Sequence, residues 1–307
     1  MEMRPHVALH PTERHDEIRG ISLCAGVGGL DIGLHLAESR YRTVCYVERN
    51  SFAAATLVAR MADASLGAAP VWDDLRSFDG RPWRGRVHLV SAGYPCQPFT
   101  LSGLRKGEDD PRHLWPDVAR IVGEIQPEWC FFENVPGHLT LGLYDVVGDL
   151  QHLGYRVAAR IQSAAEVGAS HRRDRLFILA HTDFQGQRQS GLYTGRPGGA
   201  EVPPRRQPNW QAGRDQERRK CLDTILGHSD RLGLDPGLLP IFAPGPGEFE
   251  LWGKALDARP DIKPCLQRLD DGLAHGLDRS AAAGNGVVPM AAARAFTVLR
   301  EELLTCH

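Results

Sequence analysis

Residues 21–30 read Ile-Ser-Leu-Cys-Ala-Gly-Val-Gly-Gly-Leu, a short apolar run that ends in a glycine-rich turn. After this turn, apolar residues recur at helical spacing as far as Ala37. The pattern predicts a strand, a tight turn and a helix, in which glycine lets the backbone approach a nucleotide-like ligand closely. Because many turns between a strand and a helix are rich in glycine, the pattern alone also fits an ordinary structural turn.

The chain repeats this alternation of strand and helix as far as about His181, and its character changes after that. Apolar runs predict strands at 43–47, 70–72, 87–91, 129–132 and 175–180, and helical spacing predicts helices at 51–62, 115–125, 145–153 and 291–304, with shorter helical stretches at 217–226 and 251–258. Ser51 stands where the N-cap of its helix is expected. Strands that alternate with helices predict an α/β fold with a doubly wound, mostly parallel sheet.

The composition is that of an ordinary globular protein of 307 residues, with 24% charged residues and a formal net charge of -2. The charges are unevenly distributed, because residues 183–220 contain eight Lys and Arg against four Asp and Glu, among many Gly, Pro and Gln. A basic segment of this kind suits a polyanion partner. Its composition also fits a solvated, partly disordered loop.

The seven cysteines show no Cys-x-x-Cys spacing, so no metal site is expected, and a chain of this length needs no disulfide framework. The N-terminal residues 1–20 are polar and lack the apolar core of a signal peptide. No apolar run approaches the length of a membrane span. These features predict a reducing, cytoplasmic setting and no membrane contact.

Three residues that can carry chemistry follow predicted strands, where ligands bind in this fold class. Glu48 lies about twenty residues after the glycine-rich turn, at the spacing of a ribose-binding acid. Cys96, in a Pro-Cys-Gln turn, is placed to act as a nucleophile. Glu133 follows an apolar run that would raise its pKa and let it donate a proton. Taken singly, Glu48 also fits a solvated acid at the end of a strand, Cys96 a small buried hydrophobic residue, and Glu133 the cap of a strand. Together they form a nucleophile and acid pair beside a nucleotide-type pocket.

The order and spacing of the motifs resemble the DNA cytosine-5 methyltransferase family. The matching segments are 23–30 for the cofactor loop, Glu48 for the ribose-binding acid, Asp74-Leu75 for the adenine contact, 93–103 for the nucleophile loop, 132–135 for the glutamate that meets the base, 171–177 for the Gln-x-Arg-x-Arg segment and 284–289 for the closing motif. The resemblance covers residues 20–181 and 281–307. A Pro-Cys-Gln triplet alone would occur by chance in on the order of one chain in a hundred, whereas several motifs in the right order would not.

The resemblance implies a doubly wound, Rossmann-like S-adenosylmethionine-dependent methyltransferase domain at 18–182 and 268–307, and a small target-recognition domain at 183–267. It implies catalytic roles for Cys96, Glu133, Arg173 and Arg175. The implied residues that bind S-adenosyl-L-methionine are Cys24, Ala25, Gly26, Gly28, Gly29, Leu30, Glu48, Asp74, Leu75, Pro95, Asn285 and Val287. The implied DNA-binding residues, in and beside a loop at 99–113 that would close over the site, are Gln97, Thr100, Ser102, Arg105 and Lys106.

In the implied mechanism, Cys96 attacks carbon 6 of a flipped-out cytosine in a short duplex DNA sequence. Glu133 would bind or protonate ring nitrogen 3, and Arg175 would stabilise the base and lower the pKa of the thiol. Arg173 either shares this role or pairs structurally with a carboxylate. The resemblance also implies a monomer that acts on double-stranded DNA in restriction-modification or phage DNA protection. A separately acting restriction endonuclease is a compatible partner.

Two features depart from the family pattern. Ser170-His171 stands where the family usually has Pro-Gln, and the motif that usually precedes the closing one is not evident, although 266–276 is a candidate.

Two alternatives stay open, namely a tRNA cytosine-5 methyltransferase of the same family and a catalytically silent DNA-binding relative. The Cys-Phe-Thr signature of the tRNA group is absent, and the intact Cys96, Glu133 and Arg175 count against a silent relative. An amino-directed methyltransferase would carry an Asp/Asn-Pro-Pro-Tyr/Phe motif, which the chain lacks. In a Rossmann oxidoreductase, Cys96 and Glu133 would have no role.

Overall fold

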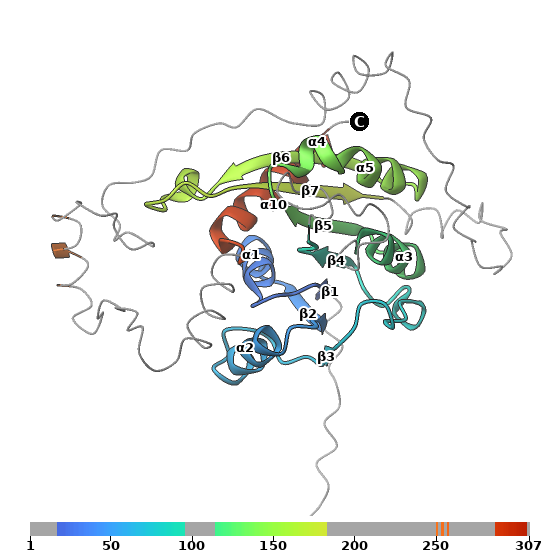
Figure 1. Ribbon diagram of the computed structural model, residues 1–307, viewed down its shortest axis with the longest axis horizontal. Helices are drawn as coiled ribbons and strands as arrows, with labels where there is room; N and C mark the ends of the chain where they lie inside the picture. The colour runs from blue at the N-terminus through green and yellow to red at the C-terminus, as the bar shows by residue number, and fades with distance from the viewer. Residues whose placement is uncertain are drawn as a thin grey trace, which may run out of the picture.

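The computed structural model describes residues 17–95, 114–182, 250, 253, 254, 257 and 286–305. These residues form a seven-stranded sheet in the order β3-β2-β1-β4-β5-β7-β6, with helices on both faces (Figure 1). The strands are β1 (Ile18–Leu23), β2 (Tyr41–Val47), β3 (Val71–Trp72), β4 (Leu89–Ala92), β5 (Trp129–Asn134), β6 (Arg156–Ser163) and β7 (Asp174–His181). The helices are α1 (Gly29–Ala37), α2 (Ser51–Ala62), α3 (Trp115–Ile125), α4 (His138–Leu141), α5 (Leu143–His152) and α10 (Pro289–Thr305), with short 3-10 turns at Arg81–Trp83 and Ala165–Val167.

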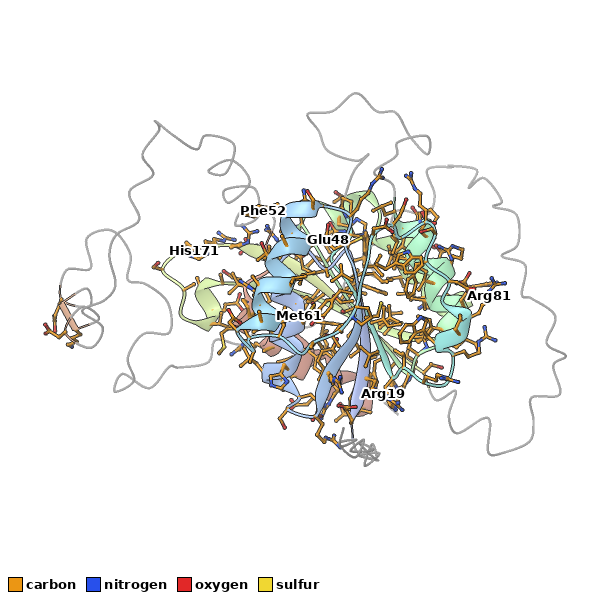
Figure 2. All side chains as sticks on the ribbon, turned by 90° about the horizontal axis from the view of Figure 1, so that it is seen from below. Arg19, Glu48, Phe52, Met61, Arg81 and His171 are labelled. Carbon is orange, nitrogen blue, oxygen red and sulfur yellow. The ribbon has the colours of Figure 1, made fainter. Side chains whose placement is uncertain are left out.

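The strand order reverses between β1 and β4. β1 pairs in parallel with β2 on one side and with β4 on the other. In doubly wound sheets, ligands bind at such a reversal, beyond the carboxyl ends of the strands. Figure 2 shows Glu48, which follows β2, and Arg19, near the start of β1, at opposite ends of the sheet. The candidate site is therefore expected at the end where Glu48 lies.

Apolar layers hold the helices against both faces of the sheet (Figure 1). On one face, α3 and α5 pack on the strands through residues such as Ile121 and Phe132. On the other face, α1 and α10 pack through Leu34 and Phe296, and α2 packs beside them through Leu57. This arrangement confirms the doubly wound fold predicted from the alternation of strands and helices.

The predicted helices at 51–62 and 115–125 are confirmed in full as α2 and α3. The other predicted elements within the described ranges occur with bounds that differ by at most three residues. The stretch at 217–226 lies outside the described residues, and of 251–258 only residues 253, 254 and 257 are described, all helical.

The predicted N-cap of α2 is wrong. Asn50, not Ser51, precedes the helix with an extended backbone, and its Oδ1 accepts a hydrogen bond from the N–H of Ala53 at 2.9 Å. Ser51 is the first helical residue. The side chain that meets the free N–H groups of the first turn decides which residue caps the helix.

One strand has no counterpart among the predicted elements. β6 pairs with β7 in an antiparallel hairpin, and β7 is also antiparallel to β5. β6 carries buried polar side chains, Arg160 and Gln162, so it lacks the apolar run that marks the other strands. The sheet is mostly parallel, as predicted, with this hairpin at one edge.

The C-terminal helix α10 returns to the sheet and contacts α1, β6 and β7. Residues 286–305 therefore belong to the same body as residues 17–95 and 114–182. The boundaries predicted for a recognition domain at 183–267 stay a prediction, because only residues 250, 253, 254 and 257 of that segment are described. Within the described part of the chain, no helix combines the length and the apolar character that crossing a membrane requires.

Candidate active site

The loop between β1 and α1 forms one wall of the site. Its backbone is left-handed at Cys24, Gly26 and Gly28, with φ of 49°, 55° and 80°. Glycine adopts these angles without strain. An ideal Cβ on Gly26 would meet no described atom within 4 Å, whereas one on Gly28 would lie 2.6 Å from a methyl group of Leu66. The loop is therefore open at Gly26 and closely packed at Gly28.

The carboxylate of Glu48 joins the end of β2 to this loop. Its Oε2 accepts a hydrogen bond from the N–H of Gly26 at 2.7 Å, and its Oε1 accepts one from the N–H of Asn50 at 2.7 Å. A carboxylate oxygen has two acceptor sites. The same group can therefore also accept hydrogen bonds from the hydroxyl groups of a ligand.

Asp74 and Leu75 follow β3, next in the sheet after β2. Oδ1 of Asp74 accepts a hydrogen bond from the N–H of Arg76 at 3.0 Å. The side chain of Leu75 is buried in the core, as is that of Leu30 in α1. Because both side chains are buried, a ligand at this site could contact chiefly the backbone of these two leucines.

Near the end of β5, Glu133 places a buried carboxyl group, only 7% exposed, where three strands end. Its Oε1 lies 2.8 Å from Nε of Arg175 on β7. An ideal Cβ on Gly93, after β4, would lie 3.6 Å from Oε2 of Glu133 and 3.7 Å from the carbonyl oxygen of Cys24, after β1. Burial raises the pKa of Glu133 to about 7, although the charges of Arg175 and Arg173 lower it. The site therefore holds a carboxyl group that can donate a proton near neutral pH.

Arg173 joins the start of β7 to the segment before α10. Its Nη2 donates a hydrogen bond to the carbonyl oxygen of Gly286 at 2.7 Å. Burial and the charge of Arg175 lower the pKa of Arg173. An ideal Cβ on Gly29 would lie 2.6 Å from the carbonyl oxygen of Val287, so this segment lies directly against the first turn of α1. One structural partner of Arg173 is thus a backbone carbonyl oxygen, and the predicted pairing with a carboxylate stays a prediction.

Tyr94 and Pro95 lead from β4 to Cys96. The carbonyl oxygen of Tyr94 accepts a hydrogen bond from Nδ2 of Asn134 at 3.1 Å, and its hydroxyl group lies 3.1 Å from Nε2 of His138. The segment that carries Glu133 therefore also holds the segment that leads to Cys96. Sequence reasoning missed both contacts, because they join positions 40 and 44 residues apart and no local pattern marks them.

A second buried carboxyl group, that of Asp31 in α1, accepts hydrogen bonds from residues of β1 and β2. Oδ2 of Asp31 accepts a hydrogen bond from Oγ of Ser22 at 2.9 Å, and Oδ1 accepts one from Oγ1 of Thr43 at 2.8 Å. Burial raises the pKa of Asp31 to about 6. These bonds fix the first turn of α1 against β1 and β2. Sequence reasoning missed this residue, and an acid among the apolar residues of the predicted helix is the signal that could have found it.

Seven predicted site residues lie outside the described residues, namely Cys96, Gln97, Thr100, Ser102, Arg105, Lys106 and Asn285. Among the residues that depart from the family pattern, His171 is exposed and lies at the outer end of the β6–β7 hairpin (Figure 2). Its neighbour Arg172 forms an ion pair with Asp174 at 2.9 Å.

Residues 18–225 match the family model of the C-5 cytosine-specific DNA methylases. The chain belongs to this family. The family inferred from the order of the motifs is thereby confirmed. The match also includes the basic segment 183–220.

Two curated relatives illustrate the similarity. The Type II methyltransferase M.AplI of Arthrospira platensis is 32% identical over 164 residues, which are 52% of this chain and 45% of the relative. The Type II methyltransferase M.NgoMIV of Neisseria gonorrhoeae is 30% identical over 168 residues, 53% of this chain and 52% of the relative. The chain thus spans about half the length of these relatives. A solved structure that it resembles is the S. pombe Dnmt2 methyltransferase, with a TM-score of 0.45 and 21% identity over 55% of this chain and 50% of that chain.

Proposed function

We propose that the protein transfers a methyl group to carbon 5 of cytosine in duplex DNA. The observation that carries this proposal is the ion pair of the buried Glu133 with the partly buried Arg175, beside Gly93, which lies three residues before Cys96. An acid whose pKa is near 7 and a neighbouring cation suit a reaction in which a neutral ring must accept electrons. The Type II methyltransferases among the relatives support DNA as the substrate.

S-adenosyl-L-methionine is the methyl donor in this proposal, and the residues at the strand reversal fit it. The open space above Gly26 leaves room for a ligand against the backbone, and the Glu48 carboxylate can accept hydrogen bonds from ribose hydroxyl groups. The residues proposed to hold it are Cys24, Ala25, Gly26, Gly28, Gly29, Leu30, Glu48, Asp74, Leu75, Pro95, Asn285 and Val287. When bound, it supplies a methyl group that a nucleophilic carbon can take up.

Carbon 5 of cytosine is not nucleophilic by itself, so the enzyme must activate the ring. The thiolate of Cys96 forms a bond to carbon 6, and Glu133 gives a proton or a hydrogen bond to nitrogen 3, which lets the ring accept the electron pair. Carbon 5 then takes up the methyl group. Loss of the proton from carbon 5 to solvent leaves its electron pair in the ring, which reforms the double bond between carbons 5 and 6 and expels the thiolate. Nitrogen 3 then returns any proton that it received to Glu133. Arg175 orients Glu133 and stabilises charge on the base.

The base must leave the duplex before Cys96 can reach carbon 6, at a cost of a few kcal/mol. We assign Gln97, Thr100, Ser102, Arg105 and Lys106 to contacts with the DNA around the flipped base. The basic excess of 183–220 suits phosphate contacts by the recognition segment.

The named roles of the relatives favour a place in a restriction-modification system, in which a separate endonuclease acts on the same DNA site. Protection of phage DNA uses the same chemistry. A single copy of the chain carries every residue of the proposed mechanism, so we propose that it acts as a monomer.

The test is a covalent trap. Duplex DNA that contains 5-fluorocytosine is incubated with the protein and tritium-labelled S-adenosylmethionine, and a protein–DNA adduct that survives denaturation is measured. Fluorine cannot leave carbon 5 as a proton does, so the working enzyme stays bound. We expect an adduct with the wild type and with Cys45→Ala, which changes a buried cysteine of β2, and none with Cys96→Ser.

Other outcomes would overturn the proposal. An adduct on fluorinated tRNA but not on DNA would identify a tRNA methyltransferase. The absence of an adduct on either substrate, with binding of S-adenosylmethionine intact, would identify a catalytically silent relative.

A further inference from the structure

Tyr94 and His138 form a buried polar link between the two loops that carry the proposed chemistry. The Tyr94 hydroxyl group lies 3.1 Å from Nε2 of His138, and the two side chains are 3% and 4% exposed. Tyr94 precedes Cys96 by two residues, and His138 follows Glu133 by five. The link therefore joins the proposed nucleophile segment to the proposed acid segment.

The Tyr94 ring is fixed by more than this bond. It packs against Trp115, Phe132 and His138, with ring centroids 5.3, 6.1 and 5.7 Å away, and Asn134 holds its carbonyl oxygen. These contacts would remain if the hydroxyl group were removed. The hydroxyl group adds a directional contact to His138.

The chain between each link residue and its chemical group is short and stiff. Pro95 has a fixed φ, and the Cα of Cys96 lies within about 7.6 Å of that of Tyr94 because it is two residues away. On the other side, the N–H of His138 donates to the carbonyl oxygen of Val135 at 3.0 Å, so the turn after Glu133 is closed. A change in the distance between Tyr94 and His138 would therefore alter how the segment that leads to Cys96 meets the segment that carries Glu133.

His138 also has little room to move. An ideal Cβ on Gly142, between α4 and α5, would lie 2.6 Å from Cε1 of the His138 ring. The imidazole is thus packed between the Tyr94 ring and the backbone at Gly142. Two polar groups buried in an apolar cluster cost free energy unless they meet, so the pair allows one arrangement of the two loops and disfavours others.

We propose that His138 is a positioning residue, which acts through the Tyr94 hydroxyl group to hold Tyr94 and Pro95, the residues that lead to the proposed nucleophile Cys96, against the segment that carries Glu133. This inference rests on the proposed cytosine methyltransferase function. A misplacement of about 1 Å can slow a reaction on the order of a hundredfold, so one buried hydrogen bond suffices for a measurable effect.

The test measures the single-turnover rate of adduct formation on 5-fluorocytosine DNA at saturating S-adenosylmethionine. We expect Tyr94→Phe and His138→Leu each to slow the adduct by roughly ten- to a hundredfold, with unchanged affinity for S-adenosylmethionine. The double variant should be no slower than the slower single variant, because both changes break the same link. His138→Gln, which can still bond the hydroxyl group, should recover part of the rate.

Tyr155→Phe is the matched control. Tyr155 is also buried, and its hydroxyl group donates to the carbonyl oxygen of Pro127 at 2.7 Å, at the other end of β5 from Glu133. We expect this variant to lose thermal stability as Tyr94→Phe does, yet to trap DNA at the wild-type rate. A rate for Tyr94→Phe equal to that of Tyr155→Phe, or effects of the two site changes that multiply, would overturn the positioning role alone. The absence of any wild-type adduct would overturn the proposed function, and the positioning role with it.

Discussion

Glu133 is a carboxyl group on which burial and charge act in opposite directions. Its nearly complete burial disfavours the carboxylate, whereas the ion pair with Arg175 at 2.8 Å favours it. Burial has the larger effect, because the pKa rises from 4.5 to about 7. Near neutral pH a substantial fraction of Glu133 is therefore protonated, which is the form that the proposed mechanism requires.

Glu133→Gln keeps the size of the side chain and removes its proton-donating acid. We expect this change to lower the rate of methyl transfer by about 10²- to 10⁴-fold. In the wild type, the rate of the step that uses the acid should fall as the pH rises through about 7, because the carboxyl group then loses its proton. Methyl transfer measured from pH 6 to 8.5 checks both statements. Glu301→Gln, on the exposed side of α10, is the control and should leave the profile unchanged.

The raised pKa of Glu133 also makes the free energy of unfolding depend on pH. The folded state binds the Glu133 proton more tightly than the unfolded state does, so this carboxyl group loses stabilising effect as the pH rises from about 4.5 to about 7. Relative to Glu133→Gln, the wild type should therefore become less stable across this range. A constant difference in the free energy of unfolding would contradict the assignment.

Helices α1 and α10 cross at glycine positions of α1. An ideal Cβ on Gly33 would lie 2.7 Å from the carbonyl oxygen of Pro289 and 2.7 Å from Cβ of Ala292. The backbone of α10 can approach α1 this closely because glycine has no side chain at the contact. The closeness of this crossing also places Val287 beside Gly29, at the end of the loop between β1 and α1.

Gly33→Ala should lower the free energy of unfolding by about 1–3 kcal/mol, because the new methyl group meets backbone that must shift. Gly148→Ala, in α5, is the matched control, since its Cβ would meet no described atom within 4 Å. That change should raise stability by up to about 1 kcal/mol, because alanine favours a helix over glycine. Urea unfolding of the two variants measures both effects. Equal destabilisation by the two changes would show that the helix crossing is not the cause.

At the scale of the whole molecule, the fold closes by bringing distant parts of the chain together. Phe296 of α10 is 4% exposed and packs edge-on against Phe131 of β5, with ring centroids 5.2 Å apart. Arg300, one turn later, bonds Glu38 at the end of α1 at 3.3 Å. Helix α10 is thus part of the core that lies between β5 and α1.

Phe296→Ala should lower the free energy of unfolding by about 3–5 kcal/mol, the usual cost of a large cavity in a core. Leu304→Ala, on the same helix but 44% exposed, should change it by less than about 1 kcal/mol. Helix loss measured by circular dichroism and the loss of hydrogen-exchange protection in β1 should both occur in one unfolding transition. Loss of α10 while β1 stays protected would show that the two ends of the chain fold separately.

Local patterns in the sequence determined much of this protein. The alternation of strands and helices predicted the doubly wound sheet, and α2 and α3 occur at the predicted bounds. The order of the motifs predicted the family. The apolar run before Glu133 predicted its raised pKa, in agreement with the structure. Each of these signals is carried by neighbouring residues, so it can be read without knowing which strands pair.

Only the tertiary structure decided which distant groups meet. Strand β6 was missed because its buried polar residues, such as Arg160, are accommodated only by the edge of the folded sheet. Arg173 and Arg175 belong to one motif, yet one bonds Gly286 and the other Glu133. The link between Tyr94 and His138 likewise joins positions 44 residues apart. The physical reason is that such contacts depend on strand order and helix packing, which bring together residues that no local pattern connects.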